Sequence, residues 1–252
     1  MLDIPLAISD YEEVIDWMDA VIAANARAYV TAAAVNLIMA AREDPEVLAA
    51  VLGATLAVPD GQPLVWALRA LGHGRATRVY GPDLMLHFCA RAAAAGTRMY
   101  LYGGRTEEAL ELLERRLRER FPGLQVVGGF SPPYRRLTDE EERRVIADID
   151  ASRAAIVWVG IGQPKQELWM AHMRPRLSAP VLVGVGAAFD FHAGLVPQAP
   201  PWMQRGGLEW VYRLAREPRR LWRRYARYNP RFVAAFLGQY LRNRRDRRGL
   251  SV

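Results

Sequence analysis

The chain of 252 residues has one cysteine, Cys89, so it cannot form an intramolecular disulfide and it suits a reducing compartment. It also lacks a long apolar run. The longest, VTAAAVNLIMAA, is interrupted by Asn36 and is shorter than the roughly 20 residues that span a bilayer. The first residues, MLDIPLAISDYEEVIDWM, have no basic region followed by an apolar core, so we expect no signal peptide. The sequence therefore argues against a disulfide scaffold and against an integral membrane protein.

Lysine is nearly absent, because Lys165 is the only one among 34 basic residues. Charge is also unevenly distributed. From Trp202 onward there are 14 arginines and 3 acidic residues, a net charge of +11. Because the whole chain carries +7, residues 1–201 carry −4. An acidic body with a basic tail predicts an anionic partner: a nucleic acid, a phospholipid surface or a phosphorylated substrate.

Short apolar runs alternate with helical patterns over the first 201 residues. The runs are AYVTAAAV, TLAVPDG, TRMYLYGG, LQVVGGF, AAIVWVGIG and PVLVGVGAAFD. Helix starts are marked by Thr106, a cap, and by the capping box of Thr138 and Glu141. Alternation of this kind is typical of βαβ units, and continuous apolar strands are typical of a sheet covered on both faces. We predict an α/β fold: a Rossmann-like, mostly parallel sheet in a catalytic domain of residues 1–201.

Residues 202–252 are predicted to form a basic helical appendage. Asn229 and Pro230 suit a helix start. After them, apolar residues recur at helical spacing: Phe232, Val233, Phe236, Leu237, Tyr240 and Leu241. A basic helix with one apolar face matches an anionic membrane surface better than it matches RNA, whose common binding modules stack bases on a sheet.

The ends of four predicted strands carry the candidate chemistry. VPDG, LYGG, VGIGQ and GVGAAFD each lie where a strand gives way to a loop. Ligands of open α/β sheets bind at the carboxyl ends of the strands, so these loops are expected to line one crevice. Asp60, in VPDG, is either an ordinary turn residue or a carboxylate that accepts a proton. The residue types alone leave both interpretations open.

The segment GIGQPKQE follows one of these strands and opens a helix. It lacks the third glycine of G-x-G-x-x-G, so it is a weak dinucleotide fingerprint, but a helix start after glycines can bind phosphate. Gln163, Gln166 and Glu167 either bind sugar hydroxyls or cap the helix. No set of His, Cys, Asp and Glu has the spacing of a metal site. We interpret Asp148 and Asp150 as part of a solvated helix face.

Several segments occur in one order that is specific to a known family. They are YVTAAAVNLIMAAREDP, AVPDGQPLVWALRALG, RVYGPDLM, MYLYGG, VGIGQPKQELW, GVGAAFDFHAG and APPWMQRGGLEWVYRLAREPRRLWRRY. Over about residues 5–240 the chain resembles the WecG/TagA/CpsF family of bacterial glycosyltransferases. The resemblance implies inverting, metal-independent transfer of a sugar, such as N-acetylmannosamine or its uronic acid, from a UDP donor. The implied acceptor is a polyprenyl-diphosphate-linked sugar at the inner face of the cytoplasmic membrane, in the synthesis of a surface polysaccharide or teichoic acid.

The resemblance also implies roles for residues. Asp60 matches the proposed general base. Thr31, Asn36 and Arg78 match residues around the sugar and acceptor, and Gln163 matches the glutamine of the donor loop. Further donor- or acceptor-binding residues are expected at Gly103, Gly104, Gly160, Gly162, Gln166, Glu167, Asp190, Arg213, Arg220 and Arg223.

The predicted partners are therefore a UDP-sugar, a lipid-diphosphate acceptor and an anionic membrane, without a cofactor, metal or nucleic acid. The resemblance is compatible with a homo-oligomer. Two alternatives remain: a nucleotide-cofactor oxidoreductase, suggested by the strand and helix alternation, and a non-enzymatic nucleic-acid-binding protein, suggested by the basic tail.

Overall fold

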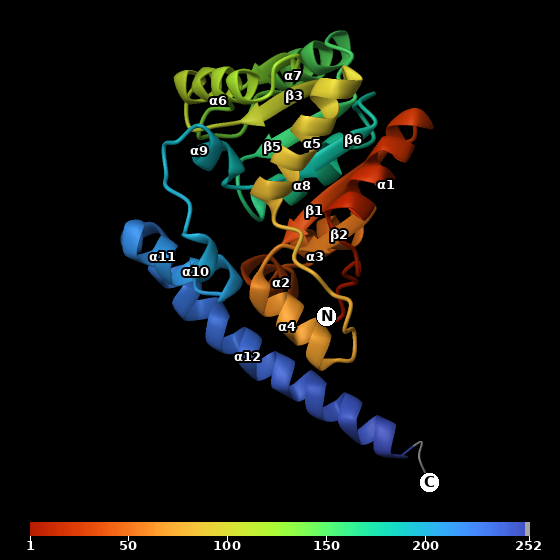
Figure 1. The fold of residues 1–252 in the computed structure, drawn as a ribbon, viewed down its shortest axis with the longest axis vertical. Coiled ribbons are helices and arrows are strands. Elements are labelled where there is room, and N and C mark those ends of the chain that lie inside the picture. Colours follow the sequence, from red (N-terminus) through yellow and green to blue (C-terminus); the bar gives the residue numbers. More distant parts are fainter. Residues whose placement is uncertain (250–252) are drawn as a thin grey trace.

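A six-stranded sheet forms the centre of the molecule (Figure 1). The structure, a computed structural model, describes residues 1–249, with side chains to residue 245. All neighbouring strands pair in parallel, in the order β2-β1-β6-β5-β3-β4. Their bounds are β1 Ala28–Ala33, β2 Leu56–Pro59, β3 Arg98–Gly103, β4 Gln125–Phe130, β5 Ile156–Gly160 and β6 Val181–Gly184. The predicted Rossmann-like α/β fold is confirmed.

Helices cover both faces of the sheet. On one face lie α1 (Tyr11–Ala23), α5 (Gly81–Ala95), α6 (Glu107–Arg120) and α9 (Ala188–His192); on the other lie α7 (Asp139–Ala151) and α8 (Lys165–Met173). Successive strand residues point to opposite faces. In β3, for example, Met99 and Leu101 join the first apolar cluster, and Tyr100 and Tyr102 join the second. Burial on both faces is why these strands read as continuous apolar runs.

The two predicted helix starts are confirmed. The side chain of Thr106 accepts the backbone N–H of Ala109 at 3.2 Å, at the start of α6. Thr138 and Glu141 form the reciprocal capping box of α7. Both caps were predictable because they depend only on residues three positions apart.

A third apolar cluster joins the tail to the body. It includes residues of α2 (Val35–Glu43), α3 (Pro45–Leu52), α4 (Gln62–Ala70) and α12 (Pro218–Gly249). Phe232 of α12 is 5% exposed and shares this cluster with Leu37 and Ile38 of α2. Between body and α12 lie α10 (Pro201–Arg205) and α11 (Glu209–Arg216) (Figure 1). The tail that we expected from residue 202 onward thus packs against the body along α2.

The helix start predicted at Asn229 and Pro230 is wrong. α12 runs without interruption through Pro230. A proline inside a helix removes one backbone hydrogen bond. Tyr228 and Phe232, on either side of it, both pack in the cluster with α2, and this packing holds the helix together. Local sequence signals could not show it, because the partners are about 190 residues away in the chain.

The predicted apolar stripe of α12 is divided between two environments. Phe232 and Phe236 pack toward α2. Val233, Leu237 and Leu241 are 54%, 51% and 56% exposed. Only the second group presents apolar surface outward. No helix among residues 1–249 has the length and apolarity to cross a bilayer.

Candidate active site

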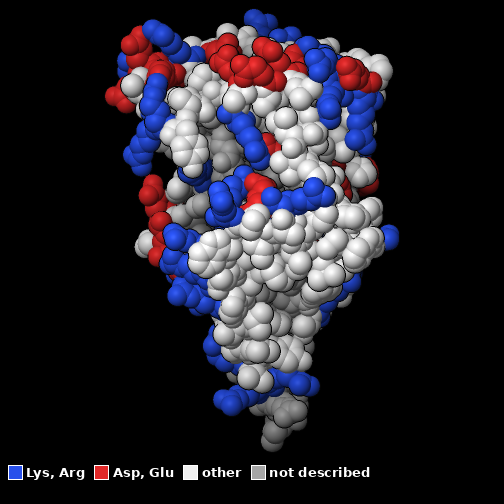
Figure 2. Space-filling view, turned by 90° about the vertical axis from the view of Figure 1, so that its left-hand side faces the viewer, with Lys and Arg blue, Asp and Glu red and all other residues white. Residues whose placement is uncertain are grey.

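A cleft of about 1390 Å³ lies where the strands end. Loops that follow all six strands line it, including the segment 131–137 after β4, and residues of α11 and α12 line it as well. Figure 2 shows basic and acidic side chains around a hollow on the side of the molecule where α11 lies. Of the predicted site residues, these line the cleft: Asn36, Asp60, Gly104, Gly160, Gly162, Gln163, Asp190, Arg213 and Arg220.

Asp60 stands at the carboxyl end of β2, with its carboxyl group in the cleft. Its backbone N–H donates to the carbonyl oxygen of Ala33 at 2.8 Å, which fixes the turn against β1. Its Oδ1 accepts the backbone N–H of Gly81 at 2.7 Å. Burial raises the pKa of Asp60 to about 7, against the lowering effect of Arg78. A carboxylate with a pKa near neutrality can accept a proton during catalysis.

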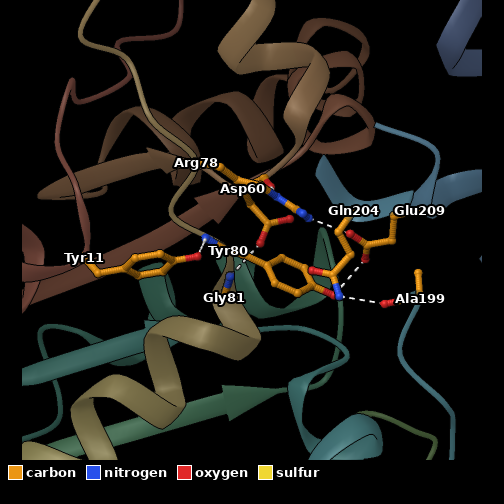
Figure 3. A network of polar contacts seen from close by, with 8 residues as sticks. All are labelled: Tyr11, Asp60, Arg78, Tyr80, Gly81, Ala199, Gln204 and Glu209. Atoms are coloured by element: carbon orange, nitrogen blue, oxygen red, sulfur yellow. Dashed lines mark hydrogen bonds and ion pairs between the residues drawn. The ribbon is translucent and has the colours of Figure 1, made fainter. Parts of the chain in front are cut away.

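Arg78 lies beside Asp60, as expected, but its charge is paired (Figure 3). Its Nε donates to the backbone carbonyl of Asp60, and its Nη2 donates to Oε2 of Glu209 at 2.6 Å. The Tyr80 hydroxyl donates to the other oxygen of Glu209 at 2.7 Å. The Arg78 guanidinium also lies 3.9 Å from the centre of the Tyr80 ring. Glu209 was missed in the sequence, although it is one of only three acidic residues in the arginine-rich tail.

Gln163 and Asn36 meet at the floor of the cleft. Gln163 Nε2 donates to the carbonyl oxygen of Ala32 at 2.6 Å, and Asn36 Nδ2 donates to Gln163 Oε1 at 3.1 Å. The loop after β5 is therefore tied to the end of β1 and the start of α2. The structure brings these two predicted residues together.

Thr31, Gln166 and Glu167 do not line the cleft, and their expected contact with a ligand stays a prediction. They are at most 1% exposed. Glu167 Oε1 accepts the Thr31 hydroxyl at 2.8 Å and Gln166 Nε2 at 3.0 Å, and Gln166 Oε1 accepts the N–H of Gly186 at 3.0 Å. Gln166 and Glu167 lie in the first turn of α8, on the side of the helix that faces the sheet. The three side chains hold the loops after β5 and β6 in place beneath the cleft.

Glu167 gives a testable pH dependence of stability. Burial raises the pKa of Glu167 from 4.5 to about 7 in the folded chain. Between these values the unfolded chain has already lost the proton that the folded chain keeps, so the free energy of unfolding falls as pH rises. The expected loss between pH 5 and pH 8 is about 2 kcal/mol from this group. Glu167→Gln should flatten that slope, measured by urea unfolding at both pH values, with Asp60 present in both proteins. An unchanged slope would contradict the assignment.

The tail arginines differ in their placement. Arg213 and Arg224 line the cleft, and their buried Nε–H groups have no hydrogen-bond partner within the described part of the chain. Arg220 lines it too and pairs with Glu217 at 2.9 Å. Arg223, which we had expected among the donor- or acceptor-binding residues, is exposed and does not line the cleft. The helical period explains this, because it puts positions 220 and 224 one turn apart on the same face.

Asp190 lines the cleft, but its carboxylate forms an ion pair with Arg105. Arg105 donates from Nε and Nη2 to its two oxygens, both at 2.9 Å. Arg105 was not identified from the sequence.

Asp148 and Asp150, which the sequence analysis interpreted as part of a solvated helix face, accept hydrogen bonds from Tyr100 and Ser178, respectively. No group of three or more His, Cys, Asp and Glu in the described residues could hold a metal ion.

Two of the predicted glycines are required by packing. Gly103 has φ +143°, and a Cβ there would lie 2.8 Å from the backbone of Gly160. A Cβ on Gly160 would lie 2.5 Å from the Phe189 ring. Both glycines let the ends of β3 and β5 and helix α9 come together. Gly162, at φ +84°, has open space instead, in the cleft.

The comparison with known families agrees with this arrangement. The model of the family described as Glycosyl transferase WecG/TagA/CpsF matches residues 1–246, nearly the whole chain. The cleft at the strand ends, with Asp60 and the tail arginines on opposite segments of its lining, lies entirely within the matched residues. The chain therefore belongs to the WecG/TagA/CpsF family and is a glycosyltransferase.

Proposed function

We propose that the protein moves one sugar, an N-acetylmannosamine-type, related hexose or uronic acid unit, from a UDP-sugar to a polyprenyl-diphosphate-linked sugar. The product belongs to the synthesis of a cell-surface polysaccharide or teichoic acid. One observation carries this proposal. A single cleft contains a carboxyl group whose pKa is raised and two arginines whose buried Nε–H groups lack a partner in the described chain. The first suits a base, and the second suits an anionic substrate.

The proposed reaction is an inverting displacement. The acceptor hydroxyl oxygen forms a bond to the anomeric carbon, and the bond from that carbon to the UDP phosphate oxygen breaks. Asp60 takes the hydroxyl proton through its carboxylate, of which Oδ1 is already oriented by Gly81. Arg213 and Arg224 offset the negative charge that develops on the departing UDP. Asp60 must be ionised before the step, so the rate is expected to rise with pH through about 7.

Nucleotide binding separates this proposal from its alternatives. Calorimetric titration with UDP, NAD and a short RNA tests all three. UDP is expected to bind, because Arg213 and Arg224 in the lining of the cleft can donate to its phosphates. Binding of NAD or RNA without binding of UDP would favour the oxidoreductase or the nucleic-acid-binding protein.

The proposed reaction uses no metal. Arginine side chains can supply the positive charge that a metal would bring to the leaving diphosphate. Transferase activity is therefore expected to be unchanged, within about two-fold, in excess EDTA. Complete loss of activity that Mg²⁺ or Mn²⁺ restores would refute this part of the proposal.

We also propose that the outward face of the tail binds the inner surface of the cytoplasmic membrane. Val233, Leu237 and Leu241 recur every four residues on α12. Other large apolar side chains of the tail are exposed too: Trp202, Leu208, Trp210, Val211 and Trp222. Figure 2 shows a broad uncharged surface below the cleft with basic side chains at its edge. Apolar side chains can enter the headgroup region while arginines meet anionic lipid. A single chain is described, so the homo-oligomer stays a prediction.

Replacing Val233, Leu237 and Leu241 together with Ser tests the membrane face. Each side chain contributes roughly 1 kcal/mol if it leaves water, so co-sedimentation with anionic vesicles should weaken about 10- to 100-fold. Leu195→Ser is the control, because Leu195 is 45% exposed and belongs to the segment after α9, outside α12. Equal binding by the triple variant and the unaltered protein would rule out this face.

A further inference from the structure

Two acidic side chains of the basic tail turn toward the body. Glu217 lies 3.9 Å from Arg105, and Glu209 contacts Arg78 and Tyr80 at 2.6 and 2.7 Å. The Glu209 and Arg78 side chains are each 15% exposed, so this ion pair is largely shielded from water. A carboxylate that is shielded from water and accepts two hydrogen bonds binds its partners more strongly than an exposed surface ion pair does. Glu209, at the start of α11, is therefore the firmest polar link from the tail to the segment beside Asp60.

That segment, residues 78–81, orients Asp60. The N–H of Gly81 binds its Oδ1, and Nε of Arg78 binds its backbone carbonyl. Residues 78–80 belong to no helix or strand. Backbone groups of the segment bind Pro59, Tyr11 and Leu84. The Val79 N–H donates to the carbonyl of Pro59 at 3.0 Å, the Tyr80 N–H donates to the Tyr11 hydroxyl at 3.2 Å, and the Tyr80 carbonyl accepts the Leu84 N–H at 2.8 Å.

Glu209 adds the side-chain contacts that hold this segment from the tail. Figure 3 shows Glu209 facing the side chains of Arg78 and Tyr80, with Asp60 beside Arg78. Glu209 is thus linked to Asp60 indirectly, through Arg78 and Tyr80 of one short loop.

Glu209 also competes with Asp60 for interaction with the Arg78 guanidinium. A guanidinium next to Asp60 stabilises its carboxylate, and Glu209 draws that guanidinium toward itself. The other charged or titratable groups around this site are Arg213 of α11, Asp83 of α5, Tyr80 and Tyr11 of α1. Among the described residues, only Glu209 both carries a negative charge next to Asp60 and is bonded to Arg78.

We propose that Glu209 is a positioning residue: through Arg78 and Tyr80, the seated tail holds the Asp60 carboxyl in its working orientation and protonation range. The proposal rests on the proposed role of Asp60 as general base. In this proposal the tail contributes to catalysis in a second way, besides binding diphosphate. The contribution comes from Glu209, an acidic residue of a basic segment.

Glu209→Gln is the test, because it keeps the size of the side chain and removes its charge. Without that charge Asp60 ionises more readily, so the acidic limb of kcat/KM against pH should move down by about half a unit. The kcat at pH 8 should fall about ten-fold, since one charge-assisted contact is lost, with KM for the donor nearly unchanged. Glu209→Asp, which retains the charge, should keep the limb in place. Glu217→Gln, the same change elsewhere in the tail, should also leave the limb in place.

A second readout does not depend on turnover. The carboxyl carbon of Asp60 can be titrated by ¹³C NMR in the unaltered protein and in Glu209→Gln. A midpoint that moves to lower pH in the variant supports the proposal, and an unmoved midpoint overturns it, whatever happens to activity. If Asp60→Asn keeps full turnover, the assignment of the base fails instead, and the NMR titration still reports on Glu209.

Discussion

Asp60→Asn is expected to lower kcat by roughly 10²- to 10⁴-fold, the range for loss of one general base. Asparagine keeps the shape of the side chain and cannot accept the proton of the acceptor hydroxyl. Affinity for UDP should change little, because the arginines expected to bind its phosphates, Arg213 and Arg224, belong to the tail. The kcat/KM of the unaltered enzyme should rise with pH to a plateau, with a midpoint near the Asp60 pKa of about 7. Steady-state assays with a short-chain acceptor over a range of pH would measure kcat and kcat/KM. Calorimetric titration would measure the affinity for UDP.

Asp190→Asn is the matched control for this prediction. Asp190 also lines the cleft, but both of its oxygens are occupied by Arg105. Its replacement should leave the acidic limb of the pH profile in place, even if substrate affinity falls. Near-normal turnover by Asp60→Asn, together with loss of the limb in Asp190→Asn, would move the base to Asp190.

The double variant Arg213→Ala and Arg224→Ala should have the second largest effect. Each arginine can donate charge-assisted hydrogen bonds to a phosphate, worth about 1.5–3 kcal/mol apiece. Their joint loss should lower kcat/KM about 10²- to 10⁴-fold toward a water-soluble acceptor, without vesicles. Both arginines line the cleft, so their guanidinium groups are expected to contact the phosphates of a bound substrate.

Arg223→Ala provides the comparison within the same helix. It removes the same charge one residue from Arg224, but Arg223 is exposed and outside the cleft. Its effect on the soluble acceptor should stay within about three-fold, as for most exposed positions. A loss as large as that of Arg224→Ala would mean that α12 is rotated in the working enzyme.

Local signals predicted the frame of the active site correctly. Strand ends, the Asp60 turn and the caps at Thr106 and Thr138 depend on residues a few positions apart, and the structure has them where the sequence placed them. Long-range pairings were beyond such reasoning. Glu209 and Arg78 are 131 residues apart, and nothing near either one indicates the other.

The phase of a helix was a second feature that the sequence could not settle. Gln166 and Glu167 follow the cleft loop immediately, which suggested contact with a ligand, but they face the sheet and bind Thr31 and Gly186. Arg223 and Arg224 are neighbours, and only the packing of α12 decides which one enters the cleft. Phe232 likewise belongs to the apolar stripe by spacing and to the core by contact with α2. Such choices are settled by tertiary packing, which periodicity alone does not contain.

Product analysis tests the central claim most directly. The enzyme would be incubated with a panel of UDP-sugars and a short-chain lipid-diphosphate sugar, and the products examined by mass spectrometry and NMR. The account predicts that at least one donor extends the acceptor by one sugar with inverted anomeric configuration, releases UDP, and does so far more slowly with Asp60→Asn. Absence of transfer from every UDP-sugar, or transfer with retained configuration, would contradict it.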